Sequence, residues 1–82
     1  MWIRPEEHKK VGKLLAKARL AAGLSQAQLA ALLGKPQSFV SSYESGQRRI
    51  DLLEFIRIVS ALKARPAEVF QRVLKVALSR PR

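Results

Sequence analysis

Short, uncharged hydrogen-bonding side chains gather on one face of a predicted helix in the middle of the chain. At about 100° per residue, the inward side of this helix carries Val40 and Tyr43. Its outward side carries Gln37, Ser38, Ser41 and Ser42. An ordinary solvated helix face is usually richer in Glu and Lys. A glutamine amide can instead bond adenine through two hydrogen bonds, and serine hydroxyls can bond either partner of a base pair. We therefore expect these side chains to contact base edges, with Gln37 the strongest candidate.

The overall charge favours a polyanionic partner. Sixteen Lys and Arg residues against six acidic residues give a net charge of +10. Residues 1–46 carry seven basic and three acidic side chains, and residues 47–82 carry nine and three. The excess is therefore spread through the fold. Charge alone does not distinguish DNA from RNA, or either from an anionic membrane.

The composition also argues against several other functions. The chain has no cysteine, so thiolate metal sites and thiol nucleophiles are excluded. Its one histidine, His8, is best interpreted as a surface residue. We expect no metal, no cofactor and no enzymatic activity, because no cluster of catalytic residue types is present. No apolar run approaches the roughly 18 residues of a membrane span, which predicts a soluble, cytoplasmic protein.

The positions of glycines, prolines and helix-capping residues predict an all-α, compact five-helix bundle that forms a single domain over residues 1–82. The expected helices span about 5–22, 25–33, 36–44, 52–62 and 66–79, the last stopped by Pro81. Two of them begin with a capping box, Ser25 with Gln28 and Asp51 with Glu54. No stretch alternates at period two for long, so strands are not expected.

Apolar periodicity predicts the residues that face the core. The expected inward set is Val11, Leu14, Leu15, Ala18, Ala22, Leu29, Leu32, Leu33, Val40, Tyr43, Leu52, Phe55, Ile56, Val59, Leu62, Val69, Phe70, Val73, Leu74 and Ala77. In the last helix, Val69, Val73, Val76 and Ala77 spread beyond one narrow face. Part of that surface could close a homodimer instead. Trp2 could pack over the first or the last helix, or stay loose.

A series of residues over the second and third helices carries a family resemblance. It comprises Leu24-Ser25-Gln26, Leu29-Ala30, Gly34, Gln37-Ser38, Val40-Ser41 and Glu44-Ser45-Gly46. The series resembles the phage-repressor family of helix-turn-helix domains, the Cro-like or XRE-type group, over roughly residues 11–62. This resemblance implies a lambda-repressor-like fold and sequence-specific binding of double-stranded DNA. It further implies a small transcriptional regulator, expected to be a homodimeric repressor acting on an inverted-repeat operator.

The resemblance also implies roles for individual residues. The expected phosphate contacts are Gln26, Lys35, Ser45, Arg48 and Arg49. The matching positions of Arg19 and Glu44 imply an internal ion pair between the first and third helices.

Two departures concern local geometry. Lys35-Pro36 precedes the third helix and gives it a weak N-cap. Lys63 stands where many relatives have glycine, which implies either a left-handed lysine or a different helix end.

Other interpretations stay open at this level. Lys9, Lys10, Lys13 and Lys17 are most simply a solvated face of the first helix, although Lys13 and Lys17 could lie along a DNA strand. The same fold could also serve as the antitoxin of a toxin–antitoxin pair, or as an adaptor whose main contacts are with a co-regulator protein.

Overall fold

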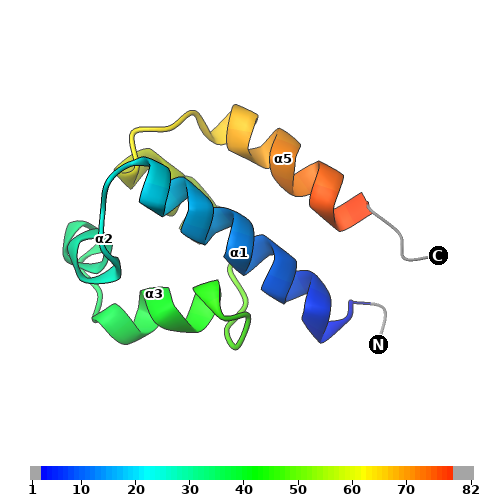
Figure 1. Ribbon diagram of the computed structural model, residues 1–82, viewed down its shortest axis with the longest axis horizontal. Helices are drawn as coiled ribbons and strands as arrows, with labels where there is room; N and C mark the ends of the chain where they lie inside the picture. Colours follow the sequence, from blue (N-terminus) through cyan, green and yellow to red (C-terminus); the bar gives the residue numbers. More distant parts are fainter. Residues whose placement is uncertain (1–2, 79–82) are drawn as a thin grey trace.

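The computed structural model describes residues 3–78, and the secondary structure of this part of the chain consists of helices without strands (Figure 1). The helices are α1 (Pro5–Ala21), α2 (Gln26–Leu33), α3 (Gln37–Glu44), α4 (Leu52–Ala61) and α5 (Pro66–Leu78). The expected all-α architecture is confirmed. Every predicted helix boundary within the described residues agrees to within one position. The expectations for Trp2, residue 79 and Pro81 fall outside the described residues.

Side chains fix the starts of α2 and α4. Ser25 Oγ accepts from the Gln28 backbone N–H at 3.0 Å, and Gln28 Oε1 accepts from the Ser25 N–H at 2.8 Å. Asp51 and Glu54 repeat this reciprocal pair at 2.7 and 3.1 Å. Each pair satisfies two backbone donors that a helix start otherwise leaves free. By contrast, the N-cap of α3 is Pro36, which supplies no side-chain hydrogen bond, so this short helix depends on its packing.

The end of α4 resolves the two alternatives for Lys63. This residue adopts the left-handed conformation, with φ of 59°. Its N–H donates to Ser60 O at 3.0 Å, and the next N–H, of Ala64, donates to Val59 O at 3.2 Å. These two bonds close the helix in the way a glycine would. The conformation is uncommon for a lysine and costs some strain.

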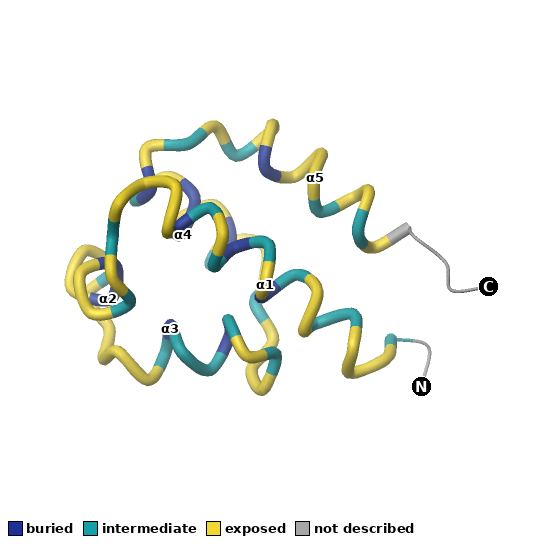
Figure 2. Tube along the Cα trace, viewed as in Figure 1, coloured by how far each residue is buried: buried dark blue, intermediate teal, exposed yellow. Residues whose placement is uncertain are grey.

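Helix α1 is central and packs against α3 on one side and α5 on the other (Figure 1). The buried residues gather where the helices face one another (Figure 2). The hydrophobic core comprises Leu15, Leu29, Ala30, Val40, Tyr43, Phe55, Ile58, Val59, Leu62 and Val69. It draws on all five helices, so α2 and α3, which are too short to be stable alone, are held by the other three.

A glycine lets α1 approach the end of α3 closely. A Cβ atom on Gly12 would overlap the backbone carbonyls of Tyr43 and Glu44. Backbone therefore packs on backbone at this crossing, and the absence of a side chain sets how near α3 lies to α1.

Several expected core residues are exposed. Leu32 and Leu52 are 62% and 66% exposed. Ala22, Ile56, Phe70, Leu74 and Ala77 are exposed as well. In α4 the covered stripe runs through Phe55, Ile58, Val59 and Leu62 at helical spacing. The apolar face of α4 is broader than the neighbouring helices can cover. Periodicity therefore predicted the apolar face of α4 but not which of its residues are buried. It missed Ile58.

Candidate nucleic-acid interface

The outward face of α3 is polar and accessible. Gln37 and Ser38 are exposed, and Ser41 and Ser42 are half-buried. Val40 and Tyr43 are fully buried beneath them. This face lies on the side of α3 turned away from α1. It can therefore approach another molecule without moving any part of the bundle.

The serines on and beside α3 are held by local backbone bonds. Ser41 Oγ donates to Ser38 O at 3.3 Å, and Ser45 Oγ donates to Ser42 O at 3.0 Å. A hydroxyl has one donor and two acceptor positions. In this geometry the Ser41 and Ser45 hydroxyls present acceptors outward, which suits contact with a donor such as a base amino group.

A chain of hydrogen bonds runs from the core to the exposed face. Arg19 Nε donates to Glu44 Oε2 at 2.8 Å, and Arg19 Nη2 donates to Glu44 Oε1 at 3.1 Å. Gln26 Nε2 donates to the same Oε1 at 2.9 Å. Gln37 Nε2 then donates to Gln26 Oε1 at 3.4 Å. These four residues, which we term the Arg19–Gln37 relay, link α1, α2 and both ends of α3.

The inner end of the relay is a buried ion pair. The Arg19 and Glu44 side chains are only 10% and 6% exposed, and Arg19 Nη1 also donates to Leu24 O at 2.8 Å. Hydrogen bonding to Glu44 raises the pKa of Arg19 above its usual value, although burial acts in the opposite direction. The two residues expected to pair thus lie in bidentate contact. Removing one partner would leave the other buried and uncompensated.

The relay changes the environment expected for Gln26. The sequence resemblance gave this residue a phosphate contact, but in the structure both ends of its amide are engaged inside the protein. Since its nitrogen faces Glu44, its oxygen must face Gln37. Gln37 therefore keeps its carbonyl oxygen and one N–H for an external partner. The sequence analysis missed the bonds from Gln26 to Glu44 and Gln37 because they join side chains of two different helices.

The loop after α3 brings two arginines into different environments. Arg48 donates to both carboxylate oxygens of Glu54, at 3.0 and 2.9 Å, and to Arg49 O at 2.8 Å. Its guanidinium lies 4.7 Å from the Phe39 ring centroid. Arg49 is exposed and forms no ion pair within residues 3–78. Of the two, Arg49 is the one whose guanidinium is free to bind a phosphate.

The Arg48–Glu54 pair has a titration consequence. Hydrogen bonds from Arg48 and from the Asp51 backbone lower the pKa of Glu54 below its ordinary value of 4.5. The same pairing raises the pKa of Arg48. Glu54 therefore stays ionised to lower pH than a free glutamate would.

Phe39 supports the cations beside α3. Its ring packs edge-on against Tyr43 with centroids 5.5 Å apart, and Lys35 Nζ lies 5.7 Å from its centroid. Lys35 and Arg48 thus both approach one aromatic ring. Phe39 was assigned to neither face of the helix from the sequence, and its role as this support was missed.

Within residues 3–78, no group of three or more His, Asp or Glu side chains is placed to hold a metal ion. None of the helices in that range is both long enough and apolar enough to cross a membrane.

Comparison with known proteins gives a consistent set of matches. The sequence profile of the family described as helix-turn-helix matches residues 15–69. The restriction-modification controller protein C.AhdI from Aeromonas hydrophila is 38% identical, with a TM-score of 0.74 over 80% of this chain and 96% of that chain. An XRE-family like protein from Pseudomonas syringae pv. tomato strain DC3000 is also 38% identical, with a TM-score of 0.76 over 84% of each chain.

A more distant structure shares the fold alone. The clp gene regulator ClgR from C. glutamicum is 19% identical, with a TM-score of 0.78 over 94% of this chain and 99% of that chain. None of the curated proteins matches the sequence significantly.

Proposed function

The chain belongs to the XRE-type helix-turn-helix family of DNA-binding transcriptional regulators, and on this premise we propose that it acts as a repressor that reads its operator with α3. The observation that carries the proposal is the exposed polar face of α3, with the Gln37 amide oriented by the Arg19–Gln37 relay. A preoriented amide meets a base without losing rotamer freedom, which favours discrimination. DNA binding would place the protein at the nucleoid, in the cytoplasm.

In this proposal α3 enters the major groove. Gln37 would bond a base edge. The shorter side chains of Ser38, Ser41 and Ser42 would contact the bases beside it. Arg49 and Lys35 would bind the sugar-phosphate backbone and fix the register. Ser45 would join them only by turning its hydroxyl from Ser42 O toward a phosphate. Gln26 and Arg48 would act mainly through protein contacts, Gln26 by holding Gln37 and Arg48 by holding the loop against Glu54.

A homodimer would explain an inverted-repeat operator. The exposed apolar side chains Leu32, Leu53 and Ile56 lie along a groove of about 580 Å³ between α2 and α4. Leu53 is 70% exposed and shares this groove with Leu32 and Ile56, so the exposed apolar side chains form a patch. This surface is a better dimer candidate than the one expected in α5, because Val69 is buried in the core. Two recognition helices would then reach successive major grooves, about 34 Å apart.

Selection of bound sites from random duplex DNA tests the proposal most directly. The expected outcome is an inverted repeat whose half-site centres lie about one helical turn apart. Recovery of no preferred sequence would contradict sequence-specific repression. A Leu53→Glu variant adds a test of the dimer. It should sediment as a monomer and should bind a single half-site about as well as the parent protein does.

The similarity to C.AhdI favours a narrower second candidate, control of a restriction–modification system. Genes for a methyltransferase and an endonuclease beside this one would support it. The exposed polar face of α3 gives no support to the antitoxin and adaptor alternatives.

A further inference from the structure

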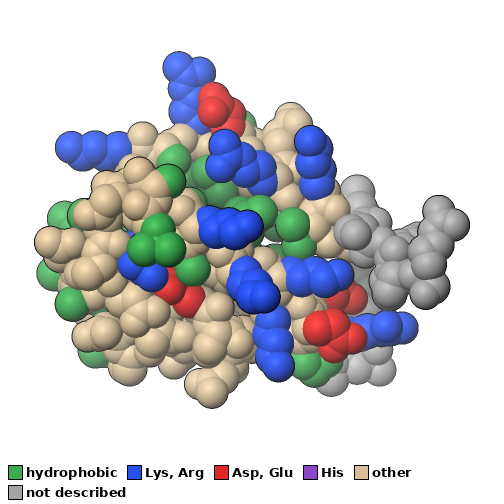
Figure 3. Space-filling view, in the orientation of Figure 1, with side chains coloured by type: hydrophobic (Ala, Val, Ile, Leu, Met, Phe, Trp, Pro, Cys, Tyr) green, Lys and Arg blue, Asp and Glu red, His purple; other side chains and the backbone are tan. Residues whose placement is uncertain are grey.

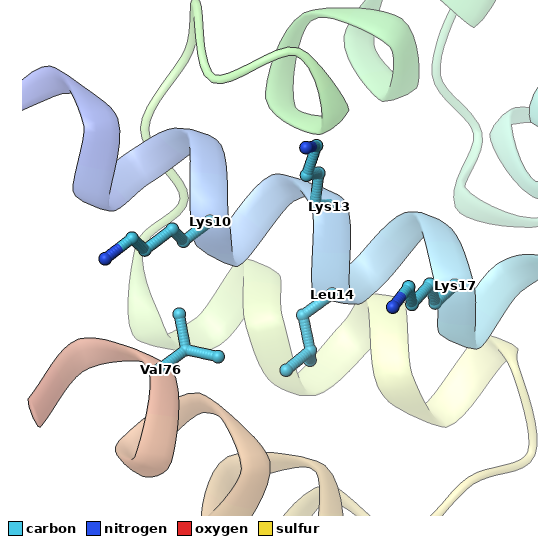
Figure 4. Close-up of a pocket in the computed structure, with 5 residues that line it drawn as sticks. All are labelled: Lys10, Lys13, Leu14, Lys17 and Val76. Atoms are coloured by element: carbon cyan, nitrogen blue, oxygen red, sulfur yellow. The ribbon is translucent and has the colours of Figure 1, made fainter. Parts of the chain in front are cut away.

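Three lysines surround an apolar groove between α1 and α5. The groove has a volume of about 290 Å³ and is lined by Lys10, Lys13, Leu14, Lys17 and Val76 (Figure 4). Lys10 and Lys17 extend on either side of Leu14, and Val76 faces them from α5 (Figure 4). The lysines are exposed, whereas Leu14 and Val76 are half-buried and form the floor. We refer to these five residues as the α1–α5 groove.

The charge of this groove is not balanced from within the protein. All six acidic side chains are already engaged. Glu6, Glu44, Glu54 and Glu68 pair with arginines, and Glu7 and Asp51 bond the backbone at helix starts. No ion pair between a lysine and an acid occurs within residues 3–78. Lys and Arg side chains accordingly dominate the surface over α1 and α5 (Figure 3).

The position of the groove separates it from the recognition surface. Gly12 marks the side of α1 that touches α3. At about 100° per residue, Lys10, Leu14 and Lys17 all point roughly opposite to Gly12. The body of α1 therefore lies between this groove and α3. The outward face of α3 points away from α1 in turn, so DNA held by α3 would lie on the other side of the bundle.

The apolar floor decides which kind of anionic partner fits. Phosphates of a duplex would gain from the lysines but nothing from Leu14 and Val76. A second copy of this chain would bring like charge against like charge. An acidic protein segment with apolar side chains would use both parts, by pairing carboxylates with lysines and by removing the floor from water.

We infer that the α1–α5 groove binds a helical segment of another protein that carries two carboxylates flanking apolar side chains. Lys10 and Lys17 are seven residues apart, two helical turns or about 10 Å along the axis. A helix packed along α1 meets that spacing with acidic residues at positions i and i+7. Apolar residues at i+3 and i+4 then lie over Leu14 and Val76. This interaction is independent of DNA binding and leaves α3 free.

A synthetic helical peptide tests the inference. The probe carries glutamates at i and i+7, leucines at i+3 and i+4, and a fluorescent label, and its binding to the full chain is followed by anisotropy. The double variant Lys10→Gln, Lys17→Gln should weaken binding by at least about tenfold. The matched double variant Lys63→Gln, Lys75→Gln removes the same charge outside the groove. It should change binding by less than about twofold.

A change in the peptide tests the floor without altering the protein. Serines in place of both leucines should weaken binding by about tenfold or more, because the peptide then no longer removes apolar surface from water over Leu14 and Val76. Equal losses in the two double variants would overturn the inference, since attraction would then follow net charge alone. The inference would also be overturned if the serine peptide bound as tightly as the leucine peptide. A Lys10→Gln, Lys17→Gln variant that loses duplex DNA affinity but keeps the peptide would overturn it as well, because the groove would then bind phosphates.

Discussion

The Gln26 side-chain nitrogen lies 2.9 Å from Glu44 Oε1, and its oxygen lies 3.4 Å from the Gln37 amide nitrogen. A glutamine amide has one donor end and one acceptor end. The carboxylate at one side therefore fixes the polarity presented at the other. The orientation of Gln37 thus depends on Glu44, which sits at the opposite end of the same helix. Arg19 in turn fixes Glu44 from α1.

The first prediction concerns Gln37. Gln37→Ala should weaken binding to the selected operator by about 1–3 kcal/mol and relax preference at one base pair. Binding of operator variants, measured at one fixed salt concentration, checks this. Gln71→Ala makes the same truncation on exposed α5 and should leave affinity unchanged. An unaltered base preference in Gln37→Ala would remove this residue from base recognition.

The second prediction concerns the buried ion pair. Arg19→Ala leaves the Glu44 carboxylate buried and without its main partner, so it should lower the free energy of unfolding by about 3–5 kcal/mol. Denaturant unfolding measures the loss. Arg65→Ala breaks the exposed pair with Glu68 and should cost no more than about 1 kcal/mol. An Arg19→Ala variant of unchanged stability would contradict a structural role for the buried ion pair.

A third prediction separates the two loop arginines. Arg49→Ala should weaken all DNA sequences alike and reduce the slope of log affinity against log salt by about 0.9, the effect of one phosphate contact. Arg48→Ala should leave that slope nearly unchanged, because its guanidinium is bonded to Glu54. Arg72→Ala on α5 controls for the general loss of charge. Equal slopes for Arg49→Ala and the parent protein would rule out the contact.

The fourth prediction follows from the lowered pKa of Glu54. A carboxyl whose pKa is lower when folded stabilises the protein above its unfolded pKa. That stabilisation is lost as pH falls from about 4.5 through the folded value. Glu54→Gln removes this titration, so its melting temperature should fall less steeply with acid than that of the parent protein. Melting curves measured from neutral pH down to pH values below the folded pKa test this. Parallel pH profiles would show that Glu54 does not contribute.

Sequence patterns predicted the helices well because their signals are local. Capping residues, glycines and prolines lie within a few positions of the ends they determine, as at Ser25 and Asp51. The division of α3 into a buried and an exposed face followed from the same local periodicity. Burial in α4 and α5 was predicted less well, because coverage depends on where other helices lie. Leu52 and Phe70 are apolar at suitable spacing and yet exposed.

In the candidate site, too, local features could be predicted from the sequence and contacts between distant residues could not. The side-chain types on α3 could be chosen from the chain alone. The partners of Gln26 and Arg48 could not be predicted. Gln26 bonds residues at both ends of α3, and Arg48 lies beside the Phe39 ring and Glu54. In both cases a side chain suited to a phosphate is held by another part of the protein.

The bare backbone of Gly12 sets, from behind, how far the recognition helix stands out from the bundle. Any side chain at Gly12 would push the carbonyls of Tyr43 and Glu44 away from α1 and would displace the C-terminal end of α3. Substitutions at a residue remote from the operator would then appear in a genetic screen as loss of repression. The position of α3 on the bundle thus depends on a residue of α1 that lies behind α3.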